Sequence, residues 1–136
     1  MRLKVEAEVR PTEDPAKVER AIKNLFPTLE LSLAGNVISG ESAAVEALDR
    51  LHQLLRSQAI LDSARSVMRR GMQGNVIKFM LNKQAAAVGK VSFTDGESPL
   101  GPITVIVEAR DAERLIDYLA PRTSEGKPIK EIEYRE

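Results

Sequence analysis

Cationic side chains gather in the middle of the chain, and their spacing is typical of contacts to phosphate. Arg65 and Arg69 lie four residues apart, which places them one turn apart on one face of a helix. Two guanidinium groups in this arrangement can follow successive phosphates, and each guanidinium fork suits phosphate oxygens. Nearby residues complete a candidate nucleic-acid-binding set, with charge or hydrogen bonds from Arg70, Lys78, Asn82, Lys83, Gln84 and Lys90.

Charge is divided unevenly along a chain that is neutral as a whole. The 136 residues include 20 basic and 20 acidic side chains. Residues 50–90 hold eight basic residues and one acidic residue, a net charge of +7, whereas the rest holds 12 basic and 19 acidic residues, or −7. This asymmetry favours an anionic partner. The alternative is that these cations pair with acids of the flanking segments or form a dimer face.

The residue types exclude several kinds of chemistry. The chain has no cysteine and one histidine, which excludes disulfides, thiolate metal sites, cysteine nucleophiles and multi-histidine metal sites. His52 lies three residues after Asp49 beside the apolar stripe of a helix, where a structural role suits it better than general-base catalysis. We therefore expect no catalytic residue, no cofactor and no strong metal site, and a weak magnesium site stays open.

The aromatic residues bear on the kind of nucleic acid. There are five, and Phe26, Phe79 and Phe93 occupy positions expected to face the core. Few are left to stack on unpaired bases, as single-strand-binding folds require. The sequence therefore favours a structured RNA, recognised by its backbone and shape.

Apolar periodicity and capping residues define the elements that position these side chains. Alternation of apolar and polar residues predicts strands at 3–9, 29–33, 37–40, 77–81, 91–93 and 103–109. Capping residues and helical spacing predict helices that begin after Asp14, after Ser42, near Ile60 (to Met72) and after Asp111. Residues 82–87 fit a loop or one helical turn, and Ile132 with Tyr134 fits a short edge strand.

This β-α-β-β-α-α-β-β-β-α order predicts one α+β domain over residues 1–136. Hairpin signals dominate, so we expect a mostly antiparallel sheet of five to six strands with helices mainly on one face, a two-layer sandwich. Residues 122–136 are expected to form a polar C-terminal tail. No membrane-spanning run and no apolar signal-peptide core are present, so a cytoplasmic location is expected.

Six short strings go beyond composition: VRPTEDP (9–15), QAILDSAR (58–65), LNKQAA (81–86), GKV (89–91), SPLGPI (98–103) and LAPRT (119–123). Together they resemble an uncharacterised archaeal family whose members are labelled predicted RNA-binding proteins or predicted exosome subunits. The resemblance runs from the first strand to about Ile129. It implies RNA binding and a fold similar to that of the large-subunit ribosomal protein that binds 5S ribosomal RNA. Three of the candidate phosphate-binding residues lie in these strings, each in a different one: Arg65, Lys83 and Lys90.

The leading hypothesis is a non-enzymatic RNA-binding protein, with structured RNA as partner, acting within an RNA-processing or ribosome-related assembly. The second hypothesis is a protein-interaction module, such as a homodimer formed through the sheet face at Met80 and Ile106. The third is a small enzyme that acts on a phosphorylated ligand. A closed pocket with a perturbed titratable group would favour the third hypothesis.

Overall fold

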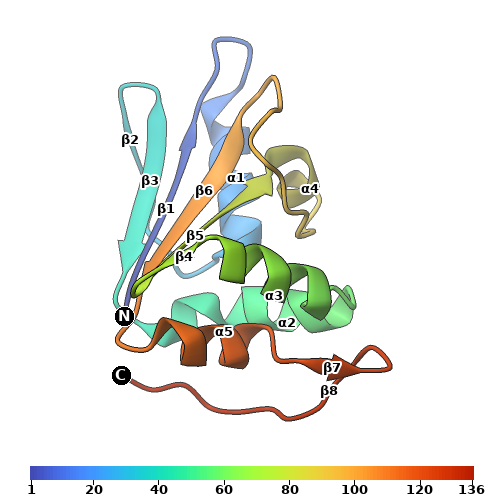
Figure 1. Ribbon diagram of the computed structural model, residues 1–136. Coiled ribbons are helices and arrows are strands. Elements are labelled where there is room, and N and C mark those ends of the chain that lie inside the picture. The colour runs from blue at the N-terminus through green and yellow to red at the C-terminus, as the bar shows by residue number, and fades with distance from the viewer.

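Six antiparallel strands form one sheet, and the helices pack against one of its faces (Figure 1). The computed structural model describes all residues, 1–136. The strand order is β2-β3-β1-β6-β5-β4. The strands are β1 (Arg2–Glu8), β2 (Ser32–Ala34), β3 (Val37–Ser42), β4 (Met72–Gln73), β5 (Val76–Asn82) and β6 (Pro102–Glu108). The α+β class and the antiparallel sheet predicted from the sequence are confirmed.

Five α-helices build the second layer. They are α1 (Pro15–Leu25), α2 (Asp49–Ser57), α3 (Leu61–Arg70), α4 (Lys83–Ala87) and α5 (Ala112–Leu119). The predicted caps at Asp14 and Asp111 are confirmed, since their side chains accept hydrogen bonds from the amides of Ala16 and Arg114. Asn82 caps α4 in the same way, so the one helical turn considered for residues 82–87 forms over Lys83–Ala87.

The core lies between the helices and one face of the sheet. Every second residue of the three central strands is buried there: Leu3, Val5, Ala7, Ile77, Phe79, Leu81, Ile103, Val105 and Val107. The residues between them, among them Lys4, Lys78 and Thr104, lie on the opposite face and are partly or fully exposed. This face carries no helix, and the alternation is the pattern of a sheet that is covered on one side only.

Several local predictions are wrong. The strand expected at 29–33 forms only over Ser32–Ala34, with Leu33 exposed. Ser42 ends β3, and its hydroxyl accepts a hydrogen bond from the amide of Ala44, so the next helix begins only after a 3-10 turn at Val45–Leu48. The helix expected over 60–72 ends at Arg70, because Met72 already pairs with β5. The strand expected at 91–93 is a loop with one bridge, from Phe93 to Leu81.

The C-terminal residues fold back along the helix layer. A short hairpin of β7 (Thr123–Ser124) and β8 (Lys127–Pro128) follows α5, and the chain then returns beneath α5 (Figure 1). The edge strand expected at Ile132 and Tyr134 does not form, because Tyr134 is buried against the core with 6% of its surface exposed. No helix of this fold has the length and apolar character needed to cross a bilayer.

Candidate nucleic-acid interface

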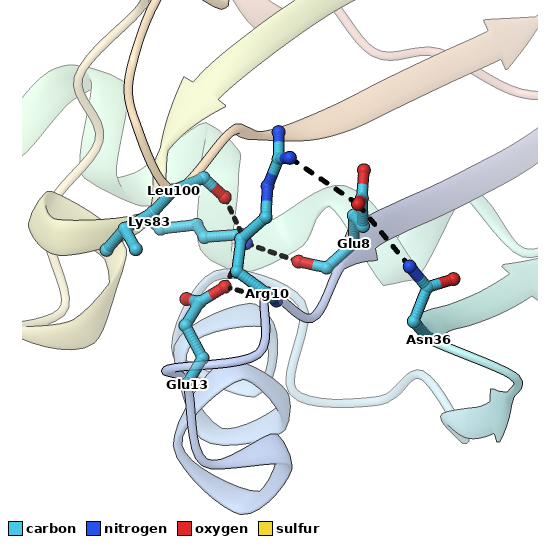
Figure 2. Close-up of polar contacts among 6 residues, drawn as sticks. All are labelled: Glu8, Arg10, Glu13, Asn36, Lys83 and Leu100. Atoms are coloured by element: carbon cyan, nitrogen blue, oxygen red, sulfur yellow. Dashed lines mark hydrogen bonds and ion pairs between the residues drawn. The ribbon is translucent and has the colours of Figure 1, made fainter.

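Lys83, one of the predicted phosphate ligands, lies inside the protein (Figure 2). Its side chain is 5% exposed. The ammonium donates hydrogen bonds to the carbonyl oxygen of Glu8, to the carbonyl oxygen of Leu100 at 2.6 Å and to Glu13 Oε1 at 2.9 Å. An ammonium has three hydrogens, and each has an acceptor here. Lys83 therefore ties α4 to β1, to the turn before α1 and to the loop before β6, with no donor left for a phosphate.

Arg10 lies beside this ammonium (Figure 2). Its Nη1 atom is 3.6 Å from Glu8 Oε1, and its main-chain amide donates to Glu13 Oε1 at 2.9 Å. A Cβ on Gly101 would lie 3.3 Å from Arg10 Nη2, and Gly101 has φ of +76°. Strings 9–15, 81–86 and 98–103 thus meet in one cluster around Arg10 and Lys83, and its contacts join elements of the fold.

The other three strings are joined through residues 58–65. Gln58 and Val91 exchange two hydrogen bonds, from the Gln58 amide to the Val91 carbonyl at 2.9 Å and from the Val91 amide to Gln58 Oε1 at 2.7 Å. The Thr123 hydroxyl donates to Asp62 Oδ1 at 2.6 Å. These contacts join the start of α3 to the loop after α4 and to the segment after α5.

The two arginines of the predicted phosphate-binding face both point to α5. Arg65 is 13% exposed, and its Nη1 atom donates to Asp117 Oδ1 at 2.7 Å and to the Ala120 carbonyl at 3.2 Å. Arg69 Nη2 lies 3.3 Å from Glu113 Oε1 and is 45% exposed. The Arg65 guanidinium therefore joins α3 to α5. The exposed pair at Arg69 is weak and can exchange for another anion.

The main chain next to Arg70 meets that of Lys78 where α3 leads into the edge strand β4. Gly71, directly after Arg70, accepts a hydrogen bond from the Lys78 amide at 2.9 Å. A Cβ on Gly71 would lie 1.9 Å from the Lys78 carbonyl oxygen, so the approach of α3 to β5 requires glycine. Arg70 and Lys78 are both exposed, and neither takes part in an ion pair. No acidic residue occurs in the sequence between Asp62 and Asp95.

The last three predicted residues lie elsewhere. Lys90 is exposed, without an ion pair, on the loop after α4. The Asn82 side chain is occupied as the cap of α4, where it accepts from the Ala85 amide at 2.9 Å. Gln84 is exposed and lines a surface hollow of about 300 Å³ together with Lys17. The eight predicted residues therefore form no single site. Arg69 and Arg70 lie in the last turn of α3, and the main chain that follows them reaches Lys78 on β5.

The single histidine lies in a different environment. The rings of His52 and Tyr118 lie with their centroids 4.7 Å apart. Burial lowers the pKa of His52, and the neighbouring Arg56 guanidinium lowers it further. Hydrogen bonds from Arg56 lower the pKa of Glu131. Arg56 Nε donates to Glu131 Oε2 at 2.8 Å, and Arg56 Nη2 donates to Glu131 Oε1 at 2.6 Å. No group of three or more acidic or histidine side chains is placed to hold a metal ion.

One-sided packing of helices on an antiparallel sheet defines a small two-layer α+β domain. The chain belongs to the UPF0201 family of archaeal proteins, and its residues 2–109 match a protein family described as RNA binding. The resemblance carried by the six strings is thereby confirmed. The likeness to the ribosomal protein that binds 5S ribosomal RNA stays a prediction.

Related proteins share nearly the whole chain. A UPF0201 protein from Sulfurisphaera tokodaii is 49% identical over 133 residues, which cover 93% of this chain and 92% of that protein. One from Thermococcus onnurineus is 48% identical over 132 residues, covering 94% of this chain and 97% of that protein. The crystal structure of the UPF0201 protein from Methanococcus jannaschii has a TM-score of 0.85 at 39% identity, and covers 96% of this chain and 100% of that one.

Proposed function

We propose that this protein binds structured RNA without catalysing a reaction, through phosphate contacts of Arg70 and Lys78. Membership of a family described as RNA binding supports the partner class. The observation that supports the site is the Gly71–Lys78 contact, which brings the main chain next to Arg70 against that of Lys78. Both cations are exposed, and neither has a carboxylate partner. Arg69 precedes Arg70 on α3, and Lys90 adds a charge on the loop after α4.

The burial of the aromatic residues supports recognition of a folded RNA. Phe26, Phe79 and Tyr134 are buried in the core. Phe93 and Tyr118 are partly buried and packed against the same core. No exposed aromatic ring is left as a platform on which unpaired bases could stack, so backbone and shape contacts supply the binding free energy.

The test is a salt series with an RNA hairpin, followed by fluorescence anisotropy. Wild-type protein should bind with an affinity that falls linearly with the logarithm of the salt concentration. The double variant Arg70→Gln/Lys78→Gln removes two phosphate contacts, and the magnitude of the slope should fall by about 0.7–0.9 for each contact. Arg20→Gln on α1 is the control, since Arg20 is exposed and has no ion pair. An unchanged slope in the folded double variant contradicts this site.

The bare face of the sheet favours a second candidate function, assembly with another copy of this chain. Met80 and Ile106 lie partly exposed on neighbouring strands of that face, among the charged side chains of Lys4 and Glu6. Cations and carboxylates on one face are complementary to the same face of a second copy. Sedimentation equilibrium of the purified protein distinguishes a dimer, which Met80→Lys would dissociate, from a monomer, which would contradict this candidate.

A further inference from the structure

A cationic hollow lies at the end of α5 that faces the β7–β8 hairpin. It measures about 320 Å³, and its charged lining comprises Arg114, Arg122, Lys130 and the single acid Asp117. The three cations come from α5, from the segment after α5 and from the segment after β8. All three lie outside residues 2–109, the part of the chain that matches the RNA-binding family. Acidic residues surround them in the sequence, so they do not stand out there as a basic segment.

Three acids of this region pair with cations other than those that line the hollow. Asp117 is held by Arg65 at 2.7 Å, and Glu131 is held by Arg56 at 2.6 Å. Glu133 Oε2 lies 3.3 Å from an arginine further along the tail. Asp117, the one acid in the lining, is therefore compensated by Arg65, and the three cations of the lining keep an unbalanced positive charge.

Two main-chain contacts order the lining of the hollow. Arg114 Nη2 donates to the Glu133 carbonyl at 3.1 Å, which fixes the guanidinium and leaves its other donors free. The Arg122 carbonyl accepts from the Ile129 amide at 2.9 Å, which holds together the two ends of the hairpin. Arg122 and Lys130 are exposed and have no ion pair. Two guanidinium forks and one ammonium around one hollow match the oxygens of a phosphate group.

We propose that this hollow binds a phosphate of the RNA backbone, so that the interface extends across α3 onto the C-terminal segment. The proposal rests on the proposed function. The hydrogen bond between Asp62 and Thr123 places the hollow near the start of α3, whereas Arg70 lies at its end. Arg70 lies eight residues after Asp62 on the helix, a rise of about 12 Å. The two groups of cations therefore contact different phosphates, and this contact positions the RNA without reading its sequence.

The first arm of the test uses inorganic phosphate. Full-length ¹⁵N-labelled protein is titrated while the guanidinium Nε–H resonances of Arg114 and Arg122 are followed by NMR. Both resonances should shift on titration, and the Arg114 shift should be lost in the variant Arg122→Gln/Lys130→Gln. Both substituted side chains are exposed, so the variant should keep the fold, which circular dichroism verifies. Absence of any shift in the wild-type protein overturns the proposal.

The second arm uses the RNA hairpin and the salt series. Arg122→Gln/Lys130→Gln should lower the magnitude of the salt slope by about 0.7–0.9, the value for one phosphate. This loss should add to that of Arg70→Gln/Lys78→Gln, with Arg20→Gln as control. Phosphate binding with an unchanged RNA slope would assign the hollow to a free anion and overturn the proposal, while a reduced slope in Arg70→Gln/Lys78→Gln would keep the proposed function. Failure of the wild-type protein to bind RNA overturns both.

Discussion

Lys83 Nζ lies 2.9 Å from Glu13 Oε1, although 70 residues separate the two in the chain. Both side chains are almost fully buried, at 5% and 11% exposure. The contact joins α4 to the turn before α1, at the point where strings 9–15 and 81–86 meet (Figure 2). A lysine that contributes to the basic middle of the sequence thus contributes nothing to the basic surface, and its charge stabilises the fold.

Replacing Lys83 should destabilise the protein strongly. Lys83→Met leaves Glu13 buried without a counter-charge and deprives two carbonyl groups, of Glu8 and Leu100, of their donor. Removing one partner of a buried pair costs about 3–5 kcal/mol in the free energy of unfolding. Urea denaturation followed by circular dichroism measures this loss.

A double-mutant cycle separates the ion pair from packing. Lys83→Met/Glu13→Gln should recover part of the lost stability, because the uncompensated carboxylate is gone. Lys17→Met is the matched control, since this exposed lysine lies in the neighbouring hollow without an ion pair, and its effect should stay within about 0.5 kcal/mol. A Lys83→Met protein as stable as the wild type would show that the buried pair is dispensable.

The secondary structure could be predicted wherever a local signal decides it. Alternation along β1 and the Asp14 and Asp111 caps depend on neighbouring residues alone, and these predictions are confirmed. The predicted strand at 91–93 failed because a distant side chain competes for its backbone. Both main-chain groups of Val91 are bonded to the side chain of Gln58, so they are not available to a strand.

The candidate site could be predicted less well for a related reason. The cations of the basic middle are visible in the sequence, but the acids that neutralise some of them come from distant segments. Asp117 and Glu113 lie on α5 and face Arg65 and Arg69. Which arginine is paired and which is free depends on how α3 packs on α5. The six strings, in contrast, do mark residues that meet in space.

Arg65 and Arg70 should therefore separate stability from RNA binding. Arg65→Ala removes charge-assisted hydrogen bonds to Asp117 and to the Ala120 carbonyl, and should lower the free energy of unfolding by about 1.5–3 kcal/mol. Arg70→Ala should leave stability within about 0.5 kcal/mol and reduce the RNA salt slope by about 0.7–0.9. Denaturation and anisotropy on both variants provide the comparison. Equal effects of the two substitutions on RNA binding would contradict this division.

Gly71 should be far less tolerant of substitution than Gly74. Gly71→Ala places a methyl group 1.9 Å from the rigid Lys78 carbonyl, and should cost about 3 kcal/mol while moving Arg70 away from Lys78. Gly74 has φ of +61° and nothing within 4 Å of an added Cβ, so Gly74→Ala should cost only the strain of the left-handed conformation, about 1–2 kcal/mol. Thermal unfolding and RNA binding are measured for both. Loss of RNA affinity in Gly74→Ala alone would contradict the role given to the Gly71 contact.

The protonation of His52 should make stability fall in mild acid. Burial and the Arg56 guanidinium hold the pKa of His52 below its usual value of 6.5 in the folded protein. The unfolded chain therefore takes up a proton at higher pH than the folded chain. The contribution of neutral His52 is complete above pH 6.5 and is lost as the pH falls through the folded-state pKa.

Measurement between pH 7 and pH 5 isolates this effect. The pKa of Glu131 is lowered from 4.5 by its hydrogen bond with Arg56, so its own contribution is lost only at lower pH. His52→Phe keeps an aromatic ring against Tyr118 but cannot titrate, and its free energy of unfolding should decrease less than that of the wild type over this range. Urea denaturation at pH 7, 6 and 5 provides the comparison. Equal losses in the two proteins would place the acid sensitivity at other groups, because His52 is the only histidine in the chain.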